Sequence, residues 1–192
     1  FGGVRFYWTG EASTVTSTDP RFKQILLVAK KLMGDTAVAN ELIEDSPFTL
    51  EALLTTMFAQ AMTFYEDKAF INGTGAGEPL GILNSPALVS VAKETGQAAA
   101  TIVAENLDKM YARMLGRSKN KAIWLVNHDC FPQLAALSRF VGTGGGPIWV
   151  TNIAAGPANQ IYGRPVIFTE LCQTLGTLGD IYLVDPSYYL IG

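Results

Sequence analysis

Apolar side chains recur every three or four positions between about residues 47 and 71, and this spacing predicts one long amphipathic helix. Ser46 places a capping hydroxyl before Pro47, a residue favoured at the first helical position, and Thr49 is an alternative cap. A helix of roughly 20 residues spans about 30 Å. Its methionine and phenylalanine side chains indicate packing in a core or on another subunit rather than a cofactor site. The apolar positions are Leu50, Leu53, Leu54, Met57, Phe58, Ala61, Phe64, Tyr65 and Ala69.

A glycine-rich segment, Gly73 to Gly77, follows this helix. Nucleotide-binding loops place their glycines after a strand and before a helix, whereas here the order is reversed and Pro79 stops any new helix. The pattern therefore predicts a structural joint, a helix C-cap in which Gly73 takes the left-handed conformation. Glu66 and Asp67 lie at the unfavourable end of the helix dipole, and we expect them to anchor this loop.

The residues before the long helix are typical of a projecting two-stranded arm. Val4 to Trp8 alternates weakly as a strand, Glu11 to Pro20 is polar and rich in Ser and Thr, and Arg21 to Met33 forms a returning strand with an aliphatic run. An isolated hairpin is marginally stable in water. The arm therefore implies a neighbour on which it lies.

Beyond the glycines, short strands alternate with amphipathic helices. We expect helices at about Leu107 to Leu115 and after Asn127, the second with Phe131, Leu134 and Leu137 facing inward, and a flexible loop at Gly142 to Gly146. Helices packed on a mixed or antiparallel sheet place the chain in the α+β class. The predicted strands are Leu88 to Ala92, Lys121 to Val126, Ile148 to Val150, Tyr162 to Thr169, Ile181 to Val184 and Tyr188 to Ile191, the last pairing back on its predecessor.

Composition narrows the function classes. Charged residues make up 16% of the 192 residues, against roughly 25% in ordinary soluble proteins, so surface is expected to be hidden against partners. The longest uncharged run, Phe140 to Gly163, is interrupted by glycines and prolines and does not read as a membrane span. A net charge of −3 gives no basic surface for sequence-specific binding to nucleic acid.

Candidate catalytic chemistry is sparse. His128 is the single histidine, and its separation by two positions from Cys130 points the two side chains to different faces of a helix. Cys130 and Cys172 lack metal or redox spacing, and we expect buried free thiols. The carboxylates of Glu41, Glu44 and Asp45 precede a helix N-terminus, where negative charge is favoured structurally. No catalytic, cofactor or metal site is predicted.

A helix that ends in an acidic pair, followed by apolar residues, Gly-x-Gly, Pro-x-Gly and an aliphatic residue, resembles the major capsid proteins of tailed bacteriophages with the HK97 fold. The motif positions are Asp67, Gly73, Gly75, Pro79 and Gly81. Tyr7 to Ala12, Ala122 to His128 and Ile161 to Val166 resemble further family segments in the family's order. The resemblance covers essentially the whole chain.

The resemblance implies a structural capsid subunit and no enzyme. Residues 1–20 would be part of the extended loop, 21–83 most of the peripheral domain with its spine helix at about 47–71, and 84–192 an axial domain incomplete at its C-terminus. Copies of the chain would form pentamers and hexamers of a DNA-filled icosahedral head, assembled in the bacterial cytoplasm and located in the virion. Scaffold, portal and decoration proteins are further expected partners, whereas a membrane is not.

Two features qualify this resemblance. Some family members crosslink through a lysine in the extended loop, but Gly10 to Pro20 contains none. The absence of an initiator methionine and an end within a predicted strand suggest a fragment or processed chain. Two alternatives remain open: an encapsulin-like compartment shell, which has the same fold, and more distantly an enzyme with an apolar cleft.

Overall fold

The computed structural model describes residues 6–11, 14, 17–18, 24, 26–39, 41, 50–141, 144–147 and 160–191. They fall into two compact units, Phe1–Ala29 with Ile191–Gly192, and Lys30–Leu190. The described residues of the first unit have no helix or strand, and the side chains of Phe6 and Trp8 are 94% and 105% exposed. Strands were expected at Val4 to Trp8 and at Arg21 to Met33, but none of the described residues in these ranges forms a strand. This agrees with the low stability of a hairpin that has no neighbour to pack on.

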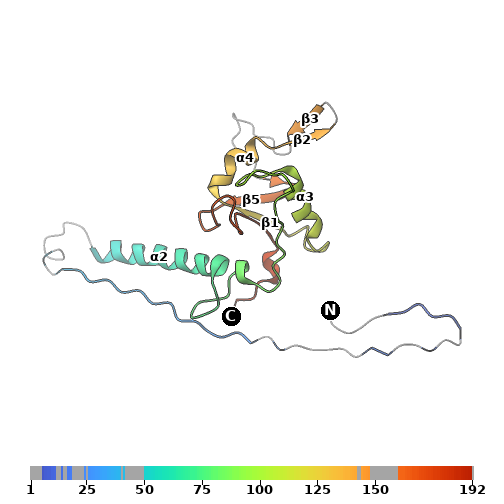
Figure 1. The fold of residues 1–192 in the computed structure, drawn as a ribbon. Coiled ribbons are helices and arrows are strands. Elements are labelled where there is room, and N and C mark those ends of the chain that lie inside the picture. The colour runs from blue at the N-terminus through green and yellow to red at the C-terminus, as the bar shows by residue number, and fades with distance from the viewer. Residues whose placement is uncertain are drawn as a thin grey trace. The chain divides into compact units, whose positions relative to one another are not determined.

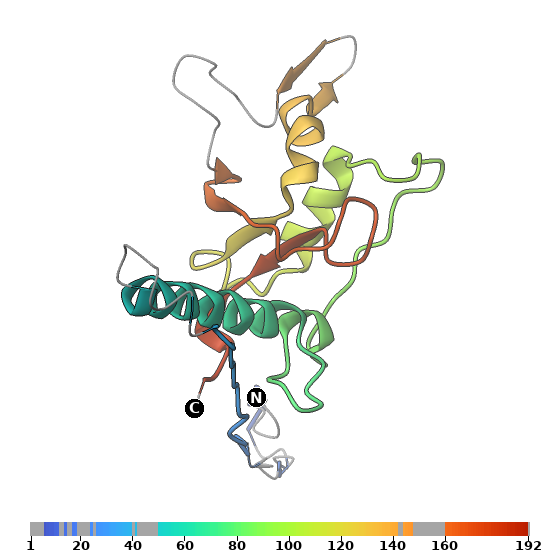
Figure 2. The ribbon, with the colours of Figure 1, turned by 90° about the vertical axis from the view of Figure 1, so that its left-hand side faces the viewer.

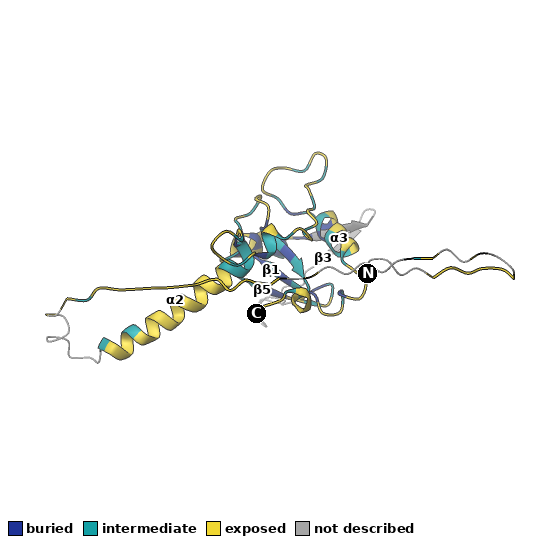
Figure 3. Cartoon of the chain, turned by 90° about the horizontal axis from the view of Figure 1, so that it is seen from below, coloured by how far each residue is buried: buried dark blue, intermediate teal, exposed yellow. Residues whose placement is uncertain are grey.

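Helix α2 (Leu50–Asn72) is the predicted long helix (Figure 1). Its expected start at Pro47 lies outside the described residues. None of its residues is buried, and Figure 3 shows it exposed along most of its length. Of the two predicted alternatives, packing in a core or on another subunit, the described residues do not show the first, and the second stays a prediction.

The second unit contains a four-stranded mixed sheet with the order β4-β5-β1-β6. Its central strand β1 runs parallel to β5 and antiparallel to β6, and β4 is antiparallel to β5. The α+β class is thereby confirmed. The strands are β1 (Ile123–Val126), β4 (Gln160–Ile161), β5 (Arg164–Phe168) and β6 (Ile181–Val184).

Two helices pack on one face of this sheet (Figure 2). Helix α3 (Ala104–Arg113) contributes Leu107, and helix α4 (Phe131–Ala135), which follows the 3-10 turn η2 (His128–Cys130), contributes Leu134. Both pack with Trp124, whose indole N–H donates to the Ile161 carbonyl at 3.1 Å. Leu134 and Leu137 are buried as predicted, but Phe131 is 37% exposed and contacts Phe168 edge-on. The core of the unit is thus the helix-covered face of a small sheet.

Other predicted elements differ locally from the structure. Part of the expected loop at Gly142 to Gly146 is strand β3 (Gly144–Pro147), which pairs with β2 (Ser138–Val141). Leu88 to Ala92 has no regular structure, and the 3-10 turns η1 (Ile82–Asn84) and η3 (Pro186–Tyr188) were not predicted. The Asp185 carboxylate accepts from the backbone N–H and the hydroxyl of Ser187, at 3.1 and 2.7 Å, and this favours a turn over the predicted return strand. Ile148 to Val150 lies outside the described residues.

Candidate functional site

The segment from Gly73 to Gly81, here called the glycine joint, closes into a tight loop at the end of α2. The Gly73 N–H continues the helix by donating to the Ala69 carbonyl at 2.9 Å, and the Gly81 N–H donates to the Gly73 carbonyl at 2.8 Å. Thr74 and Leu80 form an isolated antiparallel bridge between these ends. Many backbone N–H and carbonyl groups of the loop are therefore hydrogen-bonded within the loop and the helix end.

Glu78 holds this loop together. Its Oε1 atom accepts from the backbone N–H of Thr74 at 2.8 Å and from the Thr74 hydroxyl at 3.0 Å. These hydrogen bonds lower the pKa of the Glu78 carboxyl below its ordinary value. The carboxylates of Glu66 and Asp67, the expected anchors, make no hydrogen bond or ion pair with any residue that the structure describes. The carboxylate that anchors the loop lies within the loop, four residues from its partner Thr74, and not at the end of the helix.

The glycines of the joint are required for two different reasons. Gly75 and Gly77 both have φ of +83°, the left-handed conformation that glycine adopts without strain. Gly73 does not have a positive φ, so its predicted conformation is wrong. Instead, a Cβ atom at Gly73 would overlap the carbonyl oxygens of Pro79 and Ala69, and one at Gly81 would overlap the Gly73 nitrogen. At these two positions, glycine is needed because two backbone segments come too close together to leave room for a side chain.

The polar side chains singled out in the sequence do not converge. His128 is exposed and stacks against Phe168 with ring centroids 5.9 Å apart, whereas Cys130 is buried, as their spacing predicted. Asn127 caps the following turn by accepting from the Asp129 N–H at 2.9 Å. Of the three carboxylates before α2, Glu44 and Asp45 lie outside the described residues.

Cys130 and Cys172 are buried free thiols, as predicted. Burial, with the nearby Asp180 carboxylate as the second cause, raises the pKa of each thiol to about 12. Such thiols are protonated at neutral pH and are poor nucleophiles. They behave as core residues.

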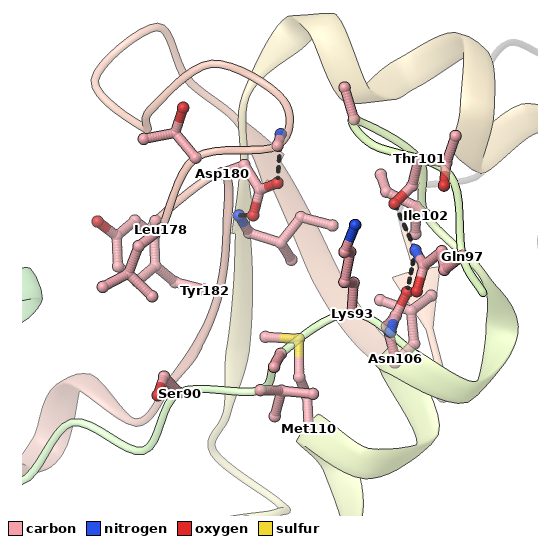
Figure 4. Close-up of a pocket in the computed structure, with 18 of the residues that line it drawn as sticks. Ser90, Lys93, Gln97, Thr101, Ile102, Asn106, Met110, Leu178, Asp180 and Tyr182 are labelled. Atoms are coloured by element: carbon pink, nitrogen blue, oxygen red, sulfur yellow. Dashed lines mark hydrogen bonds between the residues drawn. The ribbon is translucent and has the colours of Figure 1, made fainter. Parts of the chain in front are cut away.

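A cavity of about 510 Å³ lies between α3 and the loops around it (Figure 4). Its polar groups mostly hold those loops: Gln97 donates to the Thr101 carbonyl and to Asn106, at 2.6 and 2.9 Å. Both oxygens of Asp180 accept backbone N–H groups, from Gly176 and Ile181 at 2.9 and 2.8 Å. Lys93 points into the space (Figure 4). This lining does not resemble a nucleophile with its base.

Within the described ranges, no group of three or more His, Cys, Asp or Glu side chains could hold a metal ion. Over the same residues, no helix has the length and apolar character needed to cross a membrane.

Comparison with known proteins identifies the family. The profile of the phage capsid family matches residues 2–192. The major capsid protein of Escherichia phage T5 is 28% identical over 159 residues, 77% of this chain and 33% of the relative. The major capsid protein of Klebsiella oxytoca phage phiKO2 is 32% identical over 82 residues, 42% of this chain and 19% of the relative. The chain thus spans a third or less of the length of these two curated relatives.

Solved capsid structures have the same fold. The capsid of a native GTA particle matches with a TM-score of 0.73 and 20% identity, over 93% of this chain and 63% of that chain. The capsid of an empty GTA particle matches with a TM-score of 0.67 over the same shares. Since the family profile extends over nearly all the residues and the structural likeness covers 93% of them, this chain belongs to the phage capsid family, and its α+β architecture is a capsid fold.

Proposed function

We propose that this protein is a major capsid protein, a structural subunit whose copies assemble into the DNA-filled head of a tailed phage and reside in the virion. The observation that carries the proposal is α2, a helix of 23 residues with none buried. Its exposed side chains include Leu53, Met57 and Met62, at 55%, 55% and 52% exposure. A helix that is apolar on most sides is normally covered, so this surface calls for a partner.

The first unit supports the same proposal. The aromatic rings of Phe6 and Trp8 are fully accessible, and Leu26 and Val28 are 77% and 62% exposed. The residues of this unit that the structure describes form no helix or strand, so their apolar side chains can stabilise the segment only by packing against another surface. We assign residues 1–20 to part of the extended loop, 21–83 to the peripheral domain and 84–192 to an axial domain. Asp67, Gly73, Gly75, Pro79 and Gly81 remain the proposed family motif.

In this proposal, the many repeated contacts between subunits stabilise the closed shell. Each contact between copies is weak, but every subunit makes several, and closure of a symmetric shell makes dissociation of one subunit require breaking all of them. Function then needs no catalytic group. Scaffold, portal and decoration proteins remain proposed further partners. Neither an encapsulin-like compartment nor an enzyme is favoured by the family and structural matches.

The experiment is to express the full-length protein in bacteria and examine the purified material by negative-stain electron microscopy and sedimentation velocity. We expect pentamers, hexamers or closed shells. Met57→Asp with Met62→Asp should reduce the assembled fraction at least tenfold, whereas Gln60→Asp, a polar exposed position on the same helix, should not. Monomers at every concentration and ionic strength would refute the proposal. Particles filled with cargo protein rather than nuclease-protected DNA would favour the compartment shell.

A further inference from the structure

The attachment of α2 to the sheet-containing part of its unit is concentrated in its last turn. Residues 69–72 are partly buried, whereas every earlier residue of the helix except Leu50 and Leu54 is exposed. A helix of this length measures about 35 Å, so a rotation of about 10° at its C-terminal end moves the other end by about 6 Å. Small differences at the last turn therefore decide where the rest of the helix lies.

Asn72, the final residue of α2, uses both halves of its side-chain amide there. Its Nδ2 donates to the Leu171 carbonyl at 2.6 Å, and its Oδ1 accepts from the Gln173 side chain at 3.2 Å. The residue between these partners, Cys172, is buried, and its carbonyl accepts from the Asn127 side chain at 2.7 Å. Asn127 directly follows strand β1. The amide thus connects the helix end to the central strand through a fixed segment.

Two further residues contact the same joint. The Asn84 side chain donates to the carbonyls of Asn72 and Gly73, at 3.0 and 2.9 Å. The Tyr189 hydroxyl donates to the Leu80 carbonyl at 2.9 Å, and its ring contacts Phe70 with centroids 5.8 Å apart. Because the attachment of α2 to the sheet-containing part is concentrated at its C-terminal end, several separate contacts at that end are needed to fix the direction of the helix.

We propose that Asn72 is a positioning residue that sets the direction of α2 relative to the mixed sheet, by clamping the last helical turn to residues 171–173. Hydrogen bonds have strict geometry, so a polar clamp defines an angle more narrowly than apolar contact does. The inference concerns the single subunit and does not depend on assembly.

The test measures the spread of distances between α2 and α3 in unassembled full-length protein. Spin labels at Ala52→Cys and Glu105→Cys, both exposed positions, report the separation by double electron–electron resonance. Cys130 and Cys172 are buried and should take up no label, which the unsubstituted protein verifies. We expect Asn72→Ala to broaden the distance distribution at least twofold while the near-ultraviolet circular dichroism, to which the buried Trp124 contributes, stays unchanged.

Two variants separate positioning from general destabilisation. Gln173→Leu removes the side chain that donates to the Asn72 amide oxygen, and it should broaden the distribution less than Asn72→Ala. Asn120→Ala replaces an exposed asparagine away from the joint and should have no effect. If Asn72→Ala fails to fold, Asn72→Asp, which loses the donor to Leu171, provides the measurement. An unchanged width in folded Asn72 variants would overturn the proposal, even if the protein assembles normally.

Discussion

At the scale of single residues, the glycine joint shows that one residue type serves two physical needs. Gly75 and Gly77 supply left-handed backbone, whereas Gly73 and Gly81 leave room where two backbone segments touch. The sequence does not distinguish these roles, because the second depends on which chain segments meet. Substitution can distinguish them.

We predict that Gly73→Ala lowers the free energy of unfolding by about 1–3 kcal/mol, the usual range for overpacking, because its Cβ would meet backbone carbonyls that cannot rotate away. Gly116→Ala is the matched control: a Cβ there meets nothing within 4 Å, and the residue does not have a positive φ. Urea unfolding of the two variants measures the difference. Equal midpoints would show that the close approach at Gly73 is relieved without cost.

The buried thiols make stability depend on alkaline pH. The pKa of Cys130 and of Cys172 rises to about 12 in the folded state from about 9 in the unfolded chain. Folding therefore favours the protonated thiols, and this contribution is complete below pH 9 and is lost as pH rises toward 12. We predict that the fall in unfolding free energy over this window is less steep in Cys130→Ala than in wild type, as measured by urea titrations at successive pH values. Parallel curves would contradict this.

At the scale of elements, the arm and α2 show that a sequence can have the apolar pattern of an element without burying those residues within the subunit. Their apolar residues fit the patterns expected of strands and of a long helix, yet those that the structure describes are not buried. The free energy that would order the arm has to come from contacts outside it, because fixing each residue costs about 1–2 kcal/mol.

We therefore predict that the arm, including Glu11 to Pro20, exchanges its amide hydrogens rapidly in the dispersed subunit and slowly in assembled particles. Hydrogen–deuterium exchange followed by mass spectrometry measures both states, and strand β1, buried in the core, serves as the internal reference that is protected in each. Strong protection of the arm before assembly would show that it does not need a neighbour.

For the molecule as a whole, we expect the exposed aromatic rings of the arm to contact a neighbouring subunit. Phe6 and Trp8 are accessible in the free chain, so replacing both with alanine should leave the urea midpoint of the free subunit unchanged. We predict at least a tenfold increase in the concentration needed for assembly, since about 1.4 kcal/mol of lost contact energy per subunit changes an association constant tenfold. Light scattering against concentration measures this, and an unchanged threshold would exclude these rings from the interface.

Elements that depend on neighbouring residues in the chain could be predicted from the sequence alone. The spacing of apolar residues located α2, α3 and β6, the position of Asn127 predicted its cap, and the order of weak motifs led to the capsid family. Tertiary structure alone decided which carboxylate closes the joint, that Gly73 is needed for close approach, that β3 pairs with β2, and that Asn72 reaches residues 171–173. These features depend on contacts between positions brought together only by the folded backbone, and periodicity along a chain carries no information about such pairs.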